Sequence, residues 1–167
     1  MPSPQTIDKA AVLEQLRARV KAELERAMGS QKDVQAGATH EEARPENDKD
    51  TRAIEATYLA RGLAERVATL EHAHLALSKL VLRDFGESDP IALGALVTLQ
   101  EPESGAVRHY FLAPAAGGER LGTAGQSVLI VTTAAPLGRA LLGCHLGDEV
   151  RVPAPRGARD MEIVALS

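Results

Sequence analysis

The sequence predicts an α+β protein, in which an N-terminal antiparallel helical hairpin (a coiled coil) precedes a small C-terminal α+β domain. Three observations support this prediction. Apolar residues recur every three or four positions in two long runs, an acidic segment separates these runs, and short apolar stretches between glycines and prolines follow them. The first pattern is typical of amphipathic helices and the last of short strands. We place the hairpin in residues 1–86 and the second domain in residues 91–167.

The two helical runs supply the arms of the hairpin. Facing residues of two antiparallel helices have numbers that sum to a nearly constant value, because the chain reverses once between them. In the predicted register Leu16 faces Val67, and the midpoint between such paired residues places the centre of the chain reversal near Glu41. We expect the pairing to continue outward to Met28 and Ile54. The apolar positions used are Val12, Leu13, Leu16, Val20, Leu24 and Met28 in the first run, and Ile54, Tyr58, Leu59, Leu63, Val67, Leu70, Leu77, Leu80 and Val81 in the second.

Glycines and a proline indicate where the helices weaken or end. Gly29 and Gly37 are poor helix formers, so we expect the first arm to fray or bend from Gly29 onward. The second run should end near Phe85. The segment GESDP that follows, residues 86–90, combines a glycine, capping residues and a proline, which predicts the boundary between the two domains.

The second domain is expected to contain a small sheet and one short helix. Pro136, followed by LGRALLG, predicts a helix with proline in its first turn and Gly143 as its stop. The predicted strands are residues 92–99, 107–112, 127–131, 148–152 and 160–164.

Composition excludes several classes of protein. A net charge of −4 and a pI near 5.7 argue against direct binding to duplex DNA, because phosphate contacts require a basic face. One cysteine, Cys144, predicts a reducing compartment, for which the cytoplasm is the simplest choice. There is no apolar run long enough to cross a membrane and no signal-peptide pattern at the N-terminus, so we expect a soluble protein.

The acidic segment THEEARPENDKD, residues 39–50, is the expected tip of the hairpin. Carboxylate oxygens are the ligands that Mg²⁺ prefers, and a cluster at the end of a rod would present an incomplete metal site. The alternative is an ordinary solvated turn, since polar residues collect in loops. The carboxylates of the segment are Glu41, Glu42, Glu46, Asp48 and Asp50.

Motifs of self-sufficient enzymes are missing from the sequence. His40-Glu41-Glu42 begins like the zinc motif HExxH, but Arg44 stands where the second histidine is needed. The glycines of AAGGERLGTAG lack the GK[ST] ending of a phosphate-binding loop, and no GxSxG elbow occurs. We therefore expect a protein that acts through a partner.

The order of parts resembles the bacterial GreA/GreB transcript cleavage factors. The sharpest similarity is SVLIVTTAAPLGRALLGCHLGDEVRVPAP, residues 127–155, which is similar to that family's strand, Ser-Pro type turn, ARGLIG-like helix and GD turn. The run IALGALVTL, residues 91–99, is similar to the opening strand of the same domain. The resemblance implies an FKBP-like fold for the C-terminal domain and RNA polymerase as the partner.

The resemblance also implies a role for the tip. Family members carry a GDxxENAEY-like stretch whose acids help to hold Mg²⁺ at the polymerase active site. Glu41 matches an acid when residues 37–43 are aligned with it, but Ala38 then replaces the aspartate; alternatively, Glu46-Asn47 matches, with Glu42 upstream. The tip is also longer than the family pattern. The implied metal ligands are Glu41, Glu42, Glu46 and Asp50. They would share a Mg²⁺ ion with the polymerase only in the complex, and the chain by itself would bind no ion stably. The implied carboxylates that assist the polymerase are these four and Asp48.

A second implied site is the turn and short helix of the C-terminal domain, with which the family grips the rim of the polymerase secondary channel. Ala135 replaces the serine that usually precedes Pro136. Packing is an equal alternative for Leu141 and Leu142. The implied partner-binding residues are Pro136, Leu137, Gly138 and Arg139.

Four hypotheses about function follow. In the first, a cytoplasmic monomer inserts its tip into the polymerase and supports Mg²⁺-dependent cleavage of backtracked RNA; the polymerase remains the enzyme, and nucleic acid is reached only through it. In the second, the same docking blocks the channel without cleavage. A third is a peptidyl-prolyl isomerase, which needs an aromatic pocket although Tyr110 and Phe111 are the domain's only aromatic residues. The fourth is a plain coiled-coil interaction module.

Overall fold

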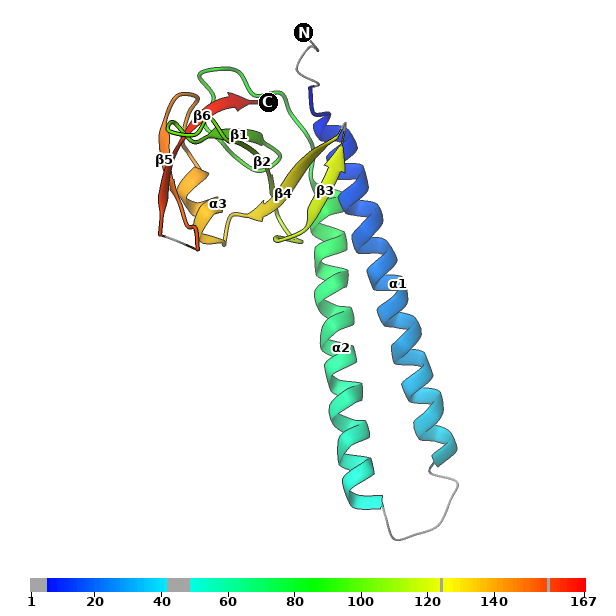
Figure 1. The fold of residues 1–167 in the computed structure, drawn as a ribbon. Coiled ribbons are helices and arrows are strands. Elements are labelled where there is room, and N and C mark those ends of the chain that lie inside the picture. The colour runs from blue at the N-terminus through cyan, green and yellow to red at the C-terminus, as the bar shows by residue number, and fades with distance from the viewer. Residues whose placement is uncertain (1–5, 42–48, 124, 156) are drawn as a thin grey trace. The chain divides into compact units, whose positions relative to one another are not determined.

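The computed structural model of the chain describes residues 6–41, 49–123, 125–155 and 157–167 (Figure 1). It confirms the predicted α+β class, with two long N-terminal helices followed by a mixed six-stranded sheet. The chain divides into two compact units. One is Ala18–Leu75, and the other combines Met1–Arg17 with Ala76–Ser167, so the second unit is assembled from both sides of the hairpin.

The hairpin consists of α1, Lys9–Glu41, and α2, Lys49–Lys79. Helix α1 runs without interruption through Gly29 and Gly37, so the expected fraying from Gly29 onward is wrong. A glycine inside a helix costs about 1 kcal/mol relative to alanine, a cost that the surrounding helical residues offset. None of the described helices is both long and apolar enough to cross a membrane.

The register of the hairpin also differs from the prediction. The predicted register places Glu23 opposite positions 59–60, whereas the Glu23 carboxylate accepts a hydrogen bond from Arg66 Nη2 at 2.7 Å. This slip is close to one heptad, and a shift of seven residues leaves the same helix faces in contact. The spacing of apolar residues therefore does not distinguish the two registers. Judged by the Glu23–Arg66 pair, the reversal centres near position 45 instead of near Glu41.

Burial of the predicted pairs is confirmed only in the part of the hairpin farthest from the acidic tip, residues 12–20 and 67–77, which we call the lower part. The rest, closer to the tip, is the outer part. Val20 and Val67 are buried, at 4% and 7% exposure. Met28 and Ile54, the predicted outermost pair, are 41% and 55% exposed, so their predicted burial is wrong. Tyr58, another predicted contact, is 71% exposed. The outer arms are thus exposed on their apolar positions as well as on their charged ones.

Helix α2 ends at Lys79, earlier than the predicted end near Phe85. Arg17 explains the position of this end. Its Nε and Nη2 donate to the Leu77 carbonyl at 3.0 and 2.9 Å, and Nη2 also donates to the Leu80 carbonyl at 2.9 Å. The last carbonyls of a helix have no intrahelical partner, and here an arginine of α1 supplies the donors. Beyond this cap the chain leaves the helix, and Phe85 joins the core of the sheet domain.

The sheet has the strand order β3-β4-β2-β1-β6-β5. Strands β2 and β4 are parallel, and every other neighbouring pair is antiparallel. All five predicted strands are present, and β3 is additional. The first strand begins later than predicted because Gly94 adopts a φ of +86° in the preceding turn. The strands are β1 Leu96–Gln100, β2 Val107–Ala113, β3 Arg120–Thr123, β4 Gln126–Thr132, β5 Glu149–Val152 and β6 Arg159–Leu166.

The core of this domain lies on one face of the sheet. Alternate residues of the central strands, such as Val97 and Leu112, pack there together with Leu141 of the short helix α3, Pro136–Leu141. The opposite face is also apolar, since Phe111 and Ile130 occupy the other set of alternate positions and are at most 1% exposed. Burial on both faces explains why the central strands are almost continuously apolar.

Candidate functional site

The tip of the hairpin is only partly described by the structure. The backbones of Glu41 and Asp50 belong to the adjoining ends of α1 and α2, while Glu42, Glu46 and Asp48 lie outside the described residues. Within residues 6–41, 49–123, 125–155 and 157–167, no three His, Cys, Asp or Glu residues lie close enough to hold a metal ion. The role of the tip carboxylates therefore stays a prediction.

The second predicted site, α3, begins after the extended residue Ala135 and ends at Leu141, two residues before Gly143. Pro136 stands in the first turn, where its fixed φ suits a helix and its missing N–H loses no bond. The Arg139 side chain donates a hydrogen bond back to the Ala134 carbonyl. The Leu142 N–H donates to the Gly138 carbonyl at 3.0 Å, and Gly143 then turns the chain with a φ of +83°.

Gly138 brings α3 into close contact with the end of β4. A Cβ atom at this position would lie 1.9 Å from the Thr132 carbonyl oxygen and 2.8 Å from its carbon. Any side chain would therefore force the helix away from the strand. This contact gives Gly138 a packing role in the domain, whether or not the residue also meets a partner.

The other α3 residues divide into buried and exposed ones. Leu141 is fully buried in the domain core, and Leu137 packs against that core, so packing accounts for both side chains. Pro136 and Arg139 are exposed, and Leu142 is 48% exposed. Pro136 and Arg139 of the predicted partner-binding helix, and Leu142 directly after it, thus have side chains that are free of a core role.

Cys144 follows this helix and is half-buried, as expected for a packed thiol. Its Sγ lies 3.1 Å from the Ala140 carbonyl oxygen, to which the thiol donates. Burial, with the Asp148 carboxylate as a second cause, raises the pKa of the thiol above its usual value. A raised pKa keeps the thiolate population low, so this cysteine is a poor nucleophile.

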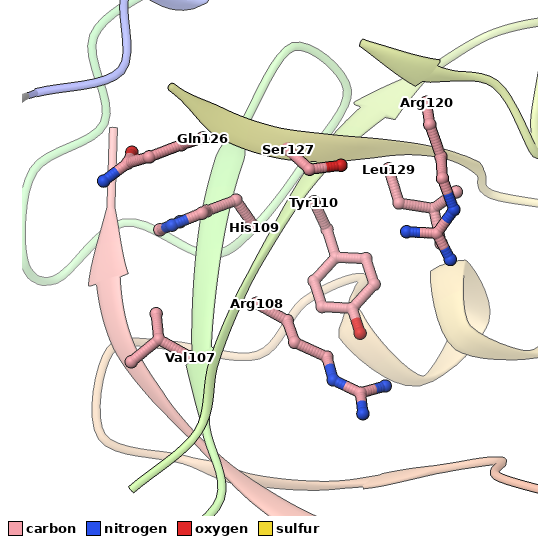
Figure 2. A pocket seen from close by; sticks show the side chains of 8 residues that line it. All are labelled: Val107, Arg108, His109, Tyr110, Arg120, Gln126, Ser127 and Leu129. Carbon is pink, nitrogen blue, oxygen red and sulfur yellow. The ribbon is translucent and has the colours of Figure 1, made fainter. Parts of the chain in front are cut away.

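A hollow that sequence reasoning missed lies on the β2, β3 and β4 part of the sheet, with a volume of about 500 Å³ (Figure 2). Its lining comes from four consecutive residues of β2 and from residues of β3 and β4. The side chains that line it are Val107, Arg108, His109, Tyr110, Arg120, Gln126, Ser127 and Leu129. Arg108 and Tyr110 lie two residues apart in a strand that the sequence predicted. Arg120 could not be added to them, because it belongs to strand β3, which was not predicted.

His109 of β2 is one of the residues that line the hollow. Its Nδ1 is 3.1 Å from the Thr98 hydroxyl on the neighbouring strand. Burial lowers the pKa of His109 below the usual 6.5, so the imidazole is mainly neutral at pH 7. This agrees with the structural role expected from the sequence.

Comparison with known proteins identifies the family. The family model described as "Transcription elongation factor, GreA/GreB, C-term" matches residues 86–167. The transcription elongation factor GreA of Desulfovibrio desulfuricans is 31% identical over 128 residues, which cover 75% of this chain and 75% of that protein. The chain belongs to the GreA/GreB family of transcription elongation factors. This confirms the resemblance seen in residues 91–99 and 127–155.

Relatives of this GreA/GreB-family chain carry two kinds of name. The transcription inhibitor protein Gfh1 of Thermus thermophilus is 31% identical over 121 residues, covering 72% of this chain and 73% of that protein. A solved structure of GreA factor homolog 1 (Gfh1) from the same organism matches with a TM-score of 0.41 and 24% identity, covering 94% of this chain and 93% of the other. Because an elongation factor and an inhibitor are equally identical to this chain, identity does not decide between the two activities.

Proposed function

We propose that this chain binds RNA polymerase in the bacterial cytoplasm and inserts its helical hairpin into the secondary channel as a monomer. The observation that carries the proposal is membership of the GreA/GreB family over three quarters of the chain. The helices support it, since α1 has 33 residues and α2 has 31. At about 1.5 Å per residue, such helices are roughly 45–50 Å long, which suits a probe of a deep channel.

The acidic tip supplies the chemistry in this proposal. Glu41, Glu42, Glu46 and Asp50 provide carboxylate oxygens, the donor type that suits Mg²⁺, and Asp48 adds negative charge beside them. Bound Mg²⁺ would supply charge stabilisation and an activated water for phosphodiester hydrolysis. The tip carboxylates would help to hold the Mg²⁺ ion and orient the water, while the polymerase carries out the cleavage of backtracked RNA.

Docking in this proposal uses the exposed side chains of α3 and the residue that follows it. Pro136, Arg139 and Leu142 are exposed while the rest of the helix is fixed against the core, so a partner would meet a rigid surface. Gly138 and Leu137 contribute by holding the helix in position. Contacts with RNA or DNA are made through the polymerase.

A second candidate function is channel blocking without cleavage. One observation favours it: Ala38 stands at the position where one alignment of the family pattern has aspartate. In this case the same docking obstructs the channel, and the altered tip gives no hydrolysis.

A transcript cleavage assay on halted polymerase complexes separates the two candidates. We expect added protein to shorten the RNA, and a variant with the five tip acids changed to their amides to bind polymerase but lose this stimulation. A matched control changes Glu25 and Glu71, which are exposed on the helices, to glutamine and should keep it. Retained cleavage by the tip variant would contradict the mechanism, and inhibited synthesis without shortened RNA would favour channel blocking. Failure of the unmodified protein to bind polymerase would remove both candidates.

The remaining alternatives have simpler tests. A prolyl isomerase needs an open aromatic pocket, but Phe111 is fully buried and the Tyr110 ring is part of the core, with 3% exposure. We expect no rate gain in a proline-peptide isomerisation assay. A plain coiled-coil module would work equally well without its acidic tip, so loss of activity in the tip variant would exclude it.

A further inference from the structure

The side chain of Arg17 joins α1 to the end of α2. Its Nε and Nη2 donate to the Leu77 carbonyl at 3.0 and 2.9 Å, and Nη2 also donates to the Leu80 carbonyl at 2.9 Å. Its Nη1 donates to the Glu14 carboxylate, one turn earlier on α1, at 2.7 Å. All three nitrogens of the guanidinium are therefore engaged, on a side chain that is 29% exposed.

The backbone acceptors give this contact a fixed place along α2. Only the last carbonyls of a helix lack a partner inside the helix, and Leu77 is two residues from the end of α2 at Lys79. A slip of seven residues moves one helix along the other by about 10 Å and sets Arg17 against the helix interior. The carbonyls there already accept intrahelical bonds. Arg17 therefore finds its acceptors in one register only.

The apolar seam between the helices does not supply the same specificity. A slip of one heptad leaves the same helix faces in contact, so apolar residues such as Val20 and Val67 stay between the helices. The Glu23–Arg66 ion pair does depend on register, but its side chains are 26% and 56% exposed, and such pairs contribute little. A polar contact that fixes the register of an apolar seam is a known device of coiled coils.

The register decides which residues lie at the end of the hairpin. The observed register centres the chain reversal near position 45, and the register one heptad away centres it near Glu41. The five tip carboxylates are spread over residues 41–50. A change of register therefore changes which of them the hairpin carries at its end.

We propose that Arg17 is a positioning residue for the acidic tip. By fixing the axial register of α1 against the end of α2, it determines which carboxylates the hairpin delivers. The role in delivery rests on the proposed function, in which these carboxylates act at the polymerase. The role in register is a property of the free chain and can be measured without the polymerase.

The register is tested by the distance between spin labels on cysteines that replace Lys32 and Glu71, which are exposed on the two helices. The labels are placed in a Cys144→Ala chain, so that they are the only thiols. We expect one narrow distance with Arg17 present. Arg17→Met should add a population about 10 Å longer, which is the rise of seven helical residues. Arg17→Lys keeps the charge without the planar fork and should add a smaller one.

The delivery of the tip is tested by the transcript cleavage assay at saturating protein. Arg17→Met should lower the tip-dependent effect about tenfold or more, since a misplaced group loses much of its effect, while its affinity for polymerase stays unchanged. A loss of folded protein would instead lower affinity and activity together, and thermal unfolding shows whether each variant is folded. Arg61→Met, which removes an exposed pair within α2, is the matched control and should change neither distance nor activity.

An unchanged label distance in both Arg17 variants would overturn the role in register. A changed distance with full activity at saturation would overturn the role in delivery. The same change in Arg61→Met would reduce the effect to the loss of any helix charge and would also overturn the proposal. If the unmodified chain does not bind polymerase, the proposed function and the role in delivery fail together, whereas the label distances still decide the role in register.

Discussion

The lower and outer parts of the hairpin have the same sequence pattern and different packing. In the lower part, Leu16 is fully buried and Val20 is 4% exposed. In the outer part, residues at the same kind of helical position are far more open, with Leu59 55% and Tyr58 71% exposed. Amphipathic periodicity therefore correctly predicts a helix in both parts, but the apolar core that it also predicts forms in only one of them.

Local interactions replace core packing in the outer part. The Thr57 hydroxyl donates to the Ala53 carbonyl at 2.8 Å, and Arg61 pairs with Glu65 one turn away at 3.1 Å. An exposed pair of this kind contributes at most about 1 kcal/mol. We therefore expect the outer arms to open at a lower free energy than the sheet domain, since stability varies along a chain with buried apolar contact.

The largest expected contrast is between two leucine truncations. Leu16→Ala removes a fully buried side chain and should destabilise the protein by about 2–5 kcal/mol. Leu59→Ala removes a 55% exposed one and should change stability by less than about 1 kcal/mol. Denaturant unfolding followed by circular dichroism measures both. Equal losses would show that the outer arms share the packing of the lower part.

Glycine substitutions sharpen the same contrast. Gly138→Ala should destabilise the sheet domain by about 1–3 kcal/mol, because its Cβ would overlap the Thr132 carbonyl oxygen. Gly29→Ala should stabilise α1 by up to about 1 kcal/mol, since a Cβ there meets nothing within 4 Å and alanine is the better helix former. The shift of the thermal unfolding midpoint measures the sign of both stability changes. A neutral Gly138→Ala would mean that α3 moves freely away from β4.

Arginine replacements compare an interaction made across the helices with a local one. Arg17→Met retains the aliphatic stem but removes the donors to the Leu77 and Leu80 carbonyls, for an expected loss of about 1–2 kcal/mol. Arg61→Met removes only the exposed pair with Glu65 and should cost less than about 0.5 kcal/mol. Hydrogen exchange at the end of α2 should rise in the first variant alone.

The smallest expected effect is a pH dependence from His109. Because burial lowers its pKa in the folded state, the unfolded chain binds the proton more readily. The contribution to stability is therefore complete above the unfolded value near 6.5 and is lost as the pH falls through the lowered folded value. His109→Gln should flatten this part of the stability curve between pH 7.5 and 5.5, whereas His145→Gln, at an exposed turn, serves as the control. An unchanged slope in His109→Gln would contradict the assignment.

The sequence predicted the types of element well because periodicity is a local property. The long helices, α3 with Pro136 and Gly143 at its ends, and five strands all follow from spacing and turn residues. Register was not predictable in the same way, because a slip of one heptad leaves the apolar faces unchanged. The length of the buried seam was also hidden, since Met28 and Val20 look equivalent in sequence although one is 41% and the other 4% exposed.

The candidate sites likewise divide into those that the sequence predicts and one that depends on strand pairing. The acidic tip and α3 are contiguous segments, so their residues could be named from sequence and family resemblance alone. The hollow is assembled from β2, β3 and β4, and its lining residues come together only through the parallel pairing of β2 with β4 and the pairing of β3 with β4. Strand β3 was missed because its Gly122 and the glycines around it predict turns. The space that Gly122 leaves beside Ser127 is a property of pairing that no single segment contains.

The cap that Arg17 places on α2 also has a consequence for the order of folding. Its donors and the Leu77 carbonyl are separated by 60 residues of chain. During synthesis at about 5–20 residues per second, the start of α1 waits roughly 3–12 s before its partner carbonyls exist. Ile7, Val12 and Leu16, which end fully or almost fully buried, are exposed for that interval. The unit that contains the sheet therefore cannot close until the whole hairpin has been synthesised, because it includes chain from both sides of the hairpin.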